Sequence, residues 1–366
     1  MKILILLPDN GLGGAEQYLK MIAEYYLKKN AHITIVFLYD RFDNSWLNLR
    51  DRKNVEYKLY TGKFKFLNII KFITYLLYIN TNKFDYVYSS HVKTTSLLGV
   101  LFRFNIFKKD FFIARESTTV FTRFKGKELR LYKILYKIGY SKVDLLICQT
   151  KVMKDQLLNV YPNFKKNTVV IPNPVDRDLI SSSEIKEIEE IKNFHNYLVS
   201  AGRLIPEKGF DVLIKAFQIL KKESNKKLKL ILLGEGPERS KLEGLIRELN
   251  LEEEVILKGI VLNVYPYFKN AMACIVSSRI EGFPNVLLQM MSQNEKILST
   301  DCAGGISDIP SITVCKTDDV QDLKNGLLEL LTKDTVGNRK IYNEYLDKRN
   351  IASFIEIVEN NLLTLN

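Results

Sequence analysis

Short apolar runs alternate with helically spaced apolar positions along most of the chain. Residues 3–7 form a wholly apolar run, which is typical of a central strand in a parallel sheet. The glycine-containing segment 10–16 comes next, and residues 33–38 form the following apolar run. Between them, apolar residues repeat at helical spacing: Tyr18, Leu19, Ile22, Ala23 and Tyr26. The chain therefore opens with a predicted strand, glycine turn, helix and strand, which is a Rossmann-like unit.

The same alternation continues and then starts again. Further strands are predicted at 86–90, 112–114, 145–148 and 168–171, and a second series begins at 197–201 and continues at 228–233, 255–257, 271–276 and 297–300. Because 366 residues exceed what one core usually carries, we expect an α/β fold of two doubly wound, Rossmann-like domains facing each other across a cleft. The expected domains are 1–172 and 195–344, joined by a proline-containing polar linker at 173–194. A helix over about 345–366 is expected to pack back on the first domain.

Charge is distributed unevenly between the two halves. Residues 1–170 hold 29 Lys and Arg against 13 Asp and Glu, a balance of +16, and the remainder has a balance of −4. Such a basic half suggests an anionic partner: nucleic acid, anionic lipid or a phosphorylated substrate.

The aromatic, lysine-containing run 61–78 is either a helix packed on the sheet or an interfacial amphipathic helix. The basic, apolar run 123–137 is either a solvated charged face or a face that lies on anionic lipid.

Cysteine use and hydropathy narrow the class of protein further. The cysteines show no Cys-x-x-Cys spacing, and we expect buried, reduced thiols: Cys148, Cys274, Cys302 and Cys315. No run of about 18 uncharged apolar residues is present, so no membrane span is expected. These features favour a cytoplasmic protein.

The stretch 277–289, S-S-R-I-E-G-F-P-N-V-L-L-Q, follows an apolar strand and opens a helix. Pro284 suits the first helical position, because its φ is fixed and its missing N–H is not needed there. The N–H groups at 285–287 would then lie at the positive end of a helix dipole, which favours phosphate. Glu281 stands just before this site, and a carboxylate beside a phosphate is repulsive unless it has a hydroxyl or cationic partner. A sugar attached to the phosphate would supply hydroxyls.

Four ordered motifs in the second half carry a family resemblance. They are G-R-L-I-P-E-K-G-F, L-G-E-G-P-E-R-S-K-L, S-R-I-E-G-F-P-N-V-L-L and S-T-D-C-A-G-G, and G-G-A-E near the start agrees with them. The chain resembles the family 4 retaining glycosyltransferases of the GT-B fold, of the bacterial surface-polysaccharide type.

The resemblance implies a role for particular residues. Arg203 and Lys208 would hold the donor's diphosphate, Glu281 would contact the transferred sugar, and His91 would lie near the donor sugar and the acceptor. These four are the expected catalytic residues. The remaining donor-binding positions are Gly13, Gly14, Gly202, Gly259, Ile260, Phe283, Pro284, Asn285, Val286 and Gln289. Glu16 is interpreted as a first-turn acid that stabilises its helix.

Three positions depart from the family pattern: Gln289, Asn294 and Asp308, which stands where a glutamate is more common. Gln289 stands where a second glutamate usually accepts hydrogen bonds from both ribose hydroxyls. A neutral amide in that place is expected to weaken donor binding by about 1 kcal/mol. Asn294 replaces a glycine after the helix and is expected to serve as a left-handed cap.

The resemblance implies a metal-independent, retaining enzyme without a cofactor. It would move a sugar from a UDP-sugar to an undecaprenyl-diphosphate-linked or oligosaccharide acceptor, in the cytoplasm or peripherally on the inner face of the cell membrane. An anionic membrane surface is the further partner that the basic first half suggests. Two alternatives are a sugar-nucleotide epimerase on the same fold and a non-catalytic partner subunit. Nucleic acid is not expected as a partner, because the basic residues form no recognised module.

Overall fold

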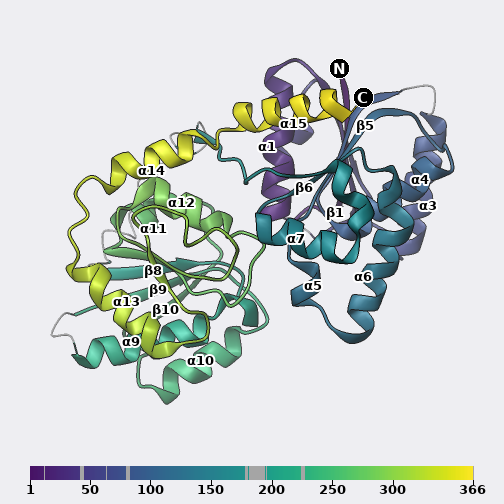
Figure 1. Cartoon of the computed structure of the whole chain (residues 1–366). Helices are drawn as coiled ribbons and strands as arrows, with labels where there is room; N and C mark the ends of the chain where they lie inside the picture. Colours follow the sequence, from purple (N-terminus) through teal and green to yellow (C-terminus); the bar gives the residue numbers. More distant parts are fainter. Residues whose placement is uncertain are drawn as a thin grey trace. The chain divides into compact units, whose positions relative to one another are not determined.

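The computed structural model describes residues 1–11, 13–41, 45–62, 64–79, 83–177, 180, 194, 196–223 and 227–365. The chain forms two compact units, which we call unit 1 (Met1–Pro174 with Ile351–Asn366) and unit 2 (Val175–Asn350) (Figure 1). Most of the predicted linker 173–194 lies outside the described residues. The prediction of two doubly wound α/β domains is confirmed, and the cleft between them stays a prediction.

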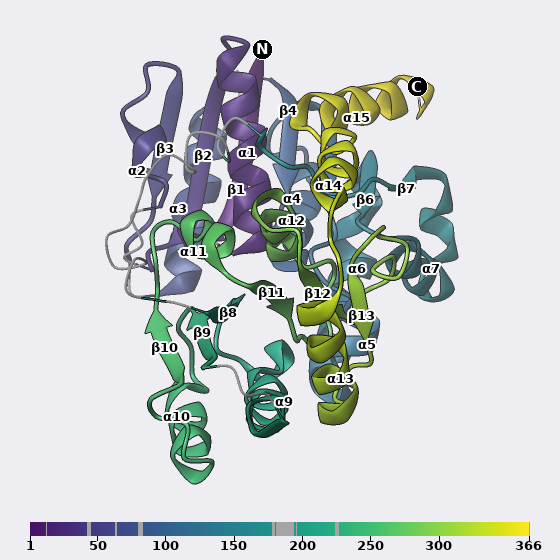
Figure 2. The same ribbon diagram turned by 90° about the vertical axis from the view of Figure 1, so that its left-hand side faces the viewer.

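Unit 1 is built on a seven-stranded parallel sheet in the order β3-β2-β1-β4-β5-β6-β7. Figure 2 shows β3, β2, β1 and β4 side by side. The apolar run at the start of the chain lies at the centre, where parallel strands are buried on both faces. The strands are β1 (Lys2–Asp9), β2 (His32–Tyr39), β3 (Val55–Leu59), β4 (Phe84–Ser89), β5 (Lys109–Arg115), β6 (Leu145–Cys148) and β7 (Thr168–Val170).

Helices cover both faces of this sheet. Alternate residues of β1 point to opposite sides, so Ile3 and Ile5 join one apolar cluster and Leu4 and Leu6 the other. The first cluster includes α1 (Gly14–Lys28) and α15 (Ile351–Leu365), whose rings Tyr18 and Phe354 lie 5.6 Å apart. The second includes α3 (Lys65–Tyr78), α4 (Val92–Arg103), α6 (Gly126–Gly139) and α7 (Lys151–Val160). Shorter segments are α2 (Leu47–Arg50), α5 (Val120–Arg123), η1 (Tyr140–Lys142) and η2 (Pro162–Asn167).

Unit 2 repeats the architecture with a six-stranded parallel sheet in the order β10-β9-β8-β11-β12-β13. Its strands are β8 (Tyr197–Ala201), β9 (Lys229–Leu233), β10 (Val255–Gly259), β11 (Ala273–Val276), β12 (Ile297–Thr300) and β13 (Thr313–Cys315). One face packs against α9 (Phe210–Glu223), α10 (Arg239–Glu248) and α13 (Val320–Thr332). The other packs against α11 (Tyr265–Asn270), α12 (Asn285–Gln293) and α14 (Asn338–Asp347) (Figure 1).

Each sheet has one place where the strand order reverses. The chain runs outward from β1 to β3 and then returns to place β4 beside β1; in unit 2 it returns to place β11 beside β8. Ligands of open α/β sheets bind at the carboxyl ends of the strands at such a switch point. The expected site residues follow these four strands or lie close to them.

The remaining general predictions concern cysteines and membrane spans. All four cysteines are unpaired and buried, as expected. Across the ranges that the structure describes, no helix combines the length and the apolarity that crossing a membrane requires.

Candidate functional site

The loops after β8 and β11 meet at the switch point of unit 2. The two strands are parallel neighbours, with Ala273 opposite Leu198. Their loops therefore leave the same edge of the sheet, and the loop after β11 carries Glu281 to the side chain of Lys208 in the loop after β8. Lys208 Nζ lies 2.5 Å from Glu281 Oε1.

The Lys208–Glu281 pair is supported on several sides. Ser278 Oγ donates a hydrogen bond to Glu281 Oε1 at 2.9 Å, and the Glu281 N–H donates to the Cys302 carbonyl at 2.8 Å. The side chains of Lys208 and Glu281 are 20% and 18% exposed, so each remains accessible to a ligand. A carboxylate next to a phosphate site needs a cationic or hydroxyl partner, and Glu281 has both. A ligand with phosphate and hydroxyl groups could therefore replace the contact between Lys208 and Glu281 with contacts of its own.

The loop that carries Lys208 is fixed by contacts with the loop after β11. A short turn, η4 (Pro206–Lys208), ends at Gly209 with φ of +62°. A Cβ on Gly209 would lie 2.2 Å from the Ser277 carbonyl oxygen, so only glycine fits there. Ser277 Oγ donates to the Lys208 carbonyl at 2.9 Å. The position of Lys208 is thus set by backbone contacts.

Arg279 ties the same two loops together, although the resemblance gave it no role. Its guanidinium forms two hydrogen bonds with the Asp211 carboxylate, at 2.9 and 2.8 Å, and one with the Pro206 carbonyl at 2.5 Å. Its Nε lies 2.6 Å from Asp318 Oδ1. The hydrogen bond to Asp211 raises the pKa of Arg279, and although burial alone would raise the pKa of Asp211, Arg279 holds it below its ordinary value. The signal was present in the sequence, since Arg279 lies inside the S-S-R-I-E-G motif.

The helix that follows Glu281 begins one residue later than expected. Pro284 is the N-cap of α12, with φ −77° and ψ 99°, and Asn285 is the first helical residue. The prediction that Pro284 occupies the first helical position was therefore wrong by one residue; its ψ is extended, which suits a flanking residue. Asn285 and Val286 remain at the helix start, where the macrodipole is positive. Gln289 lies one turn further along the same face as Asn285.

Phe283 is buried in the short loop before α12. It is 8% exposed, and the guanidinium of Arg349 lies 5.5 Å from the centre of its ring. Arg349 also lies 4.4 Å from the ring of Tyr345. Phe283 therefore anchors the loop through packing and a cation–π contact.

The other predicted donor-binding positions of unit 2 lie at the ends of strands β8 and β10. Gly202 and Arg203 follow β8, and Gly259 and Ile260 lie at the end of β10. A Cβ on Gly202 would lie 3.2 Å from Lys208 Cε, so Gly202 leaves room for the lysine stem. The Arg203 and Ile260 side chains are exposed. The structure thus brings Lys208 and Glu281 into contact and leaves the side chain of Arg203, in the loop after β8, in contact with solvent.

The prediction for Asn294 was wrong. Its backbone is extended, with φ −127° and ψ 150°, and is not left-handed. The side chain is buried and donates to the carbonyl groups of Phe268 and Ala271, at 2.8 and 2.7 Å. Its Oδ1 accepts from the Lys296 N–H at 2.8 Å. Asparagine is used here to satisfy buried backbone groups, a role that glycine could not fill.

The switch point of unit 1 carries a second acid–base pair, in which the acid follows the first strand and the base follows the fourth. Glu16 lies in the first turn of α1 after β1, and His91 is the N-cap of α4 after β4; His91 Nε2 and Glu16 Oε1 are 2.9 Å apart. Burial alone would raise the pKa of Glu16, but the hydrogen bond and charge of His91 hold it below its ordinary value. Glu16 thus does more than stabilise its helix, because it also orients His91.

The glycines of this loop are placed against the same carboxylate. Gly13 is the N-cap of α1 and Gly14 its first residue. A Cβ on Gly13 would lie 2.7 Å from Glu16 Oε2, which is closer than real Cβ contacts. Gly13 therefore leaves the space that the Glu16 carboxylate occupies.

A buried polar network at the same edge of unit 1 escaped the sequence reasoning. Arg115 is 3% exposed and donates to Ser90 Oγ at 3.0 Å and to Asn173 Oδ1 at 2.5 Å. Its guanidinium also lies over the ring of Tyr18, 4.5 Å from the centre, and burial lowers the pKa of Arg115 to about 10. Strand-end positions were the available signal, since Arg115 directly follows an apolar run.

No group of three or more His, Cys, Asp or Glu side chains suited to a metal ion occurs in the described part of the chain.

Solved structures similar to this chain define its class. HepE of Anabaena in complex with UDP-glucose is 19% identical, with a TM-score of 0.81, and the match covers 100% of both chains. Sucrose-phosphate synthase from Thermosynechococcus elongatus is 16% identical, with a TM-score of 0.77 and the same coverage. Together with the two parallel Rossmann-like sheets, these likenesses show the GT-B fold.

Family models place the chain within that class. The model "Glycosyltransferase Family 4" matches residues 12–179, and "Glycosyl transferases group 1" matches residues 181–349. The chain belongs to the family 4 glycosyltransferases, as the motifs predicted.

Relatives in this family include enzymes of lipid-linked sugar assembly. N-acetylgalactosamine-N,N'-diacetylbacillosaminyl-diphospho-undecaprenol 4-alpha-N-acetylgalactosaminyltransferase of Campylobacter jejuni is 31% identical over 57% of this chain and 56% of its own length. An uncharacterized glycosyltransferase of Methanocaldococcus jannaschii is 30% identical over 57% of this chain and 52% of its own length. The matched region thus spans about half the length of these relatives.

Proposed function

We propose that this protein is a retaining, metal-independent glycosyltransferase that uses a UDP-sugar. The acceptor would be an undecaprenyl-diphosphate-linked sugar or an oligosaccharide, in the synthesis of a surface polysaccharide. One observation carries the proposal: Lys208, Glu281 and Ser278 meet at the switch point of unit 2, next to the start of α12. The UDP-glucose bound in the similar HepE structure and the acceptor named for the Campylobacter relative support the two substrate classes.

The charges of unit 2 suit a leaving diphosphate. Negative charge grows on the diphosphate as its bond to the sugar breaks, and fixed positive groups aimed at it lower the barrier. Lys208 supplies a point charge, Arg203 can fork onto phosphate oxygens, and the α12 start supplies backbone N–H groups. These groups would do the work of a metal ion.

Glu281 has a different part in the proposal. Its carboxylate would accept hydrogen bonds from the hydroxyls of the transferred sugar and orient it. Because the resemblance to retaining family members offers no protein nucleophile, we propose same-face attack by the acceptor, in which the leaving phosphate takes the acceptor's proton. The product would keep the anomeric configuration of the donor. His91, held by Glu16, would serve the sugar or the acceptor from unit 1.

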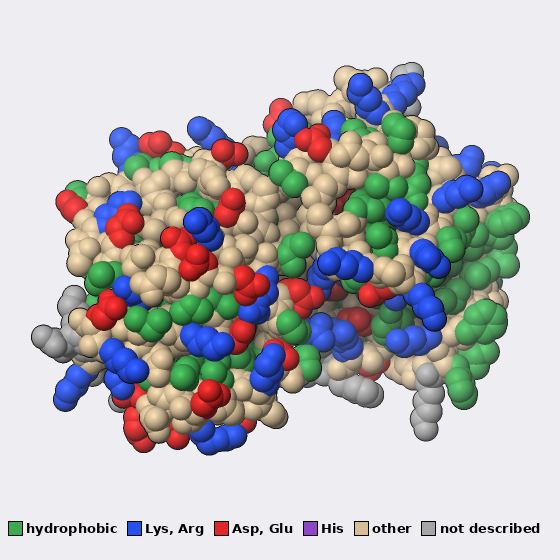
Figure 3. Space-filling model, turned by 60° about the horizontal axis from the view of Figure 1, so that its bottom comes forward, with side chains coloured by type: hydrophobic (Ala, Val, Ile, Leu, Met, Phe, Trp, Pro, Cys, Tyr) green, Lys and Arg blue, Asp and Glu red, His purple; other side chains and the backbone are tan. Residues whose placement is uncertain are grey.

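The outer helices of unit 1 suit a membrane surface. Exposed apolar residues lie on or next to α3, where Phe64, Phe66 and Tyr78 are 70%, 71% and 87% exposed, and α6 exposes Leu131, Ile134 and Ile138. Exposed basic residues lie among them: Lys65, Lys71, Lys127, Arg130, Lys133 and Lys137. Hydrophobic side chains lie beside Lys and Arg on the right-hand part of the surface in Figure 3. We propose that these two helices contact anionic lipid.

The transferase proposal is tested by binding and by product analysis. Calorimetry with UDP-, GDP- and ADP-sugars should show that UDP-sugars bind most tightly. Transfer to undecaprenyl-diphosphate-linked sugars, with the anomeric configuration read by NMR, should show retention. Inversion would refute the mechanism, and epimerisation of the free donor without acceptor would favour an epimerase.

A second candidate function rests on Gln289, which replaces an expected glutamate. If no nucleotide sugar is hydrolysed or transferred although UDP binds, the chain is a non-catalytic partner.

The membrane part is tested separately by flotation with vesicles. Binding should require anionic lipid and weaken when Arg130 and Lys137 are changed to Glu, whereas Lys215→Glu on unit 2 should have no effect; binding independent of anionic lipid would remove this part.

A further inference from the structure

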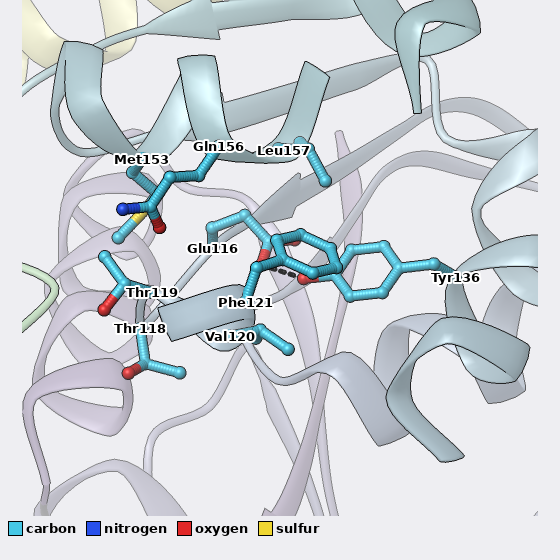
Figure 4. A pocket seen from close by; sticks show the side chains of 9 residues that line it. All are labelled: Glu116, Thr118, Thr119, Val120, Phe121, Tyr136, Met153, Gln156 and Leu157. Carbon is cyan, nitrogen blue, oxygen red and sulfur yellow. Dashed lines mark hydrogen bonds between the residues drawn. The ribbon is translucent and has the colours of Figure 1, made fainter. Parts of the chain in front are cut away.

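A small cavity in unit 1 lies where β5 ends. It is enclosed by the loop that follows β5, by α5 and by residues of α6 and α7 (Figure 4). The lining residues are Glu116, Thr118, Thr119, Val120, Phe121, Tyr136, Met153, Gln156 and Leu157. The cavity is therefore at the carboxyl edge of the sheet, where α/β proteins bind ligands.

Three polar atoms of this lining lack partners. Glu116 Oε1, Thr119 Oγ1 and Gln156 Oε1 are buried and have no hydrogen-bond partner among the described residues. Glu116 and Thr119 are only 3% and 7% exposed. The other carboxylate oxygen, Glu116 Oε2, accepts from the Tyr136 hydroxyl at 2.5 Å, as the dashed line in Figure 4 shows. Buried polar groups without partners are rare and costly, so three of them around one cavity point to a missing group.

The lining specifies the chemistry of that group. The cavity has about 10 Å³ of free space, which is room for one oxygen the size of a water molecule. Two of the three atoms are acceptors, and the Thr119 hydroxyl both donates and accepts. An anion such as phosphate would be repelled by the Glu116 carboxyl. A hydroxyl group, in contrast, can donate to Glu116 or Gln156 and accept from Thr119. Most of the remaining wall is apolar and is formed by Val120, Phe121, Met153 and Leu157.

We propose that the cavity formed by Glu116, Thr119 and Gln156 is a specificity subsite that takes a single hydroxyl group of a carbohydrate ligand. The inference rests on the proposed function, in which the carbohydrate is the acceptor. Thr118 and Gln156, which line the cavity, are half-buried, so the cavity lies close to the surface of unit 1. Tyr136 lies on α6, whose outer face we assign to lipid, which would place the subsite close to where a lipid-linked sugar arrives.

The test measures carbohydrate binding, with UDP binding as an independent readout. Saturation-transfer NMR on the full chain would use three probes in the presence of UDP: the methyl glycosides of N-acetylgalactosamine, N-acetylglucosamine and glucose. The variants are Thr119→Val, which keeps the shape and removes the hydroxyl, and Gln156→Met. The matched control is Thr332→Val, an exposed threonine on α13 of unit 2.

We expect at least one probe to bind the wild-type protein and Thr119→Val to raise its Kd about tenfold, the effect of losing one well-placed hydrogen bond. Gln156→Met should act in the same direction, and the monodeoxy probe that lacks the seated hydroxyl should bind wild type and Thr119→Val equally. The Kd for UDP should not change. If no probe binds, or if both variants bind the probes as wild type does, the cavity holds only water and the inference is wrong. Failure of UDP to bind while a probe still binds would instead refute the proposed donor.

Discussion

The two units share one topology, and each places an acid–base pair at its switch point, but the acid and the base follow opposite strands. In unit 1 the acid, Glu16, follows the first strand and the base, His91, follows the fourth; in unit 2 the base, Lys208, follows the first strand and the acid, Glu281, follows the fourth. The basic partner is a lysine in unit 2 and a histidine in unit 1. Each switch point thus joins a carboxylate to a basic group, with the chain order of the two reversed.

The net charges of the two halves of the chain do not match the position of the proposed phosphate site. The first 170 residues carry a balance of +16, but the proposed diphosphate cations belong to the half with a balance of −4. The basic excess of unit 1 lies in large part on exposed helices such as α6. Net charge therefore indicates which surface attracts an anionic partner, while the position of a phosphate site depends on which cation the fold brings to a strand end.

The largest expected effect comes from removing the fixed cation of unit 2. Lys208→Ala should reduce kcat for sugar transfer by about 10²- to 10³-fold, because a preorganised charge on the leaving group is lost. Steady-state kinetics with circular dichroism as a folding check would measure it. Lys215→Ala, an exposed lysine on α9, is the control, and His91→Ala should have a smaller effect. A mild effect of Lys208→Ala would contradict the assignment of charge to unit 2.

The next largest effect concerns pH and the buried acid of unit 1. Burial raises the pKa of Glu116 to about 7, in spite of its hydrogen bonds with Tyr136 and Tyr140 and the nearby charge of Arg115. Because the folded state holds this proton more tightly, its contribution to stability is complete below pH 4.5 and is lost as pH rises through 7. Compared with Glu116→Gln, the wild-type free energy of unfolding should therefore fall by about 3 kcal/mol between pH 4.5 and 7.5.

Urea unfolding of both proteins over that pH range would measure the difference. Parallel curves for wild type and Glu116→Gln would show that the carboxyl is not desolvated in the folded protein.

A smaller effect is expected where the loop of Lys208 turns. Gly209→Ala should destabilise the protein by about 2 kcal/mol, since its φ is +62° and the new Cβ would meet the Ser277 carbonyl. Gly244→Ala is the matched control: Gly244 lies inside α10 with no atom near its added Cβ, so the change should stabilise by up to about 1 kcal/mol. Thermal unfolding would compare them, and equal melting temperatures would show that the loop of unit 2 is not fixed by this contact.

The smallest effect is expected at Gln289. Gln289→Glu should tighten UDP binding by up to about tenfold or leave it unchanged, because a carboxylate accepts from both ribose hydroxyls. Calorimetry with UDP would measure the change. A large loss of affinity would show that the ribose is bound differently in unit 2 from the family pattern.

The strand and helix order of both units could be predicted from the sequence, because apolar periodicity and glycine turns report directly on local structure. The family resemblance singled out Lys208 and Glu281 as site residues, and their roles stay a prediction. The cap of Asn294 was predicted wrongly, since the buried carbonyl groups of Phe268 and Ala271 that its side chain satisfies come from a distant helix and loop. Arg279 was overlooked for the same reason: its carboxylate partners come from other segments of the chain.

The sequence by itself determined the fold class, the family and the loops that hold the candidate site. Only the tertiary structure decided that Lys208 meets Glu281, that Glu16 meets His91, and that Glu116, Thr119 and Gln156 surround one cavity. The physical reason is that periodicity and capping are local properties of the chain. Pairing and burial, in contrast, depend on which strands become neighbours, and the crossover to β4 and to β11 fixes that choice.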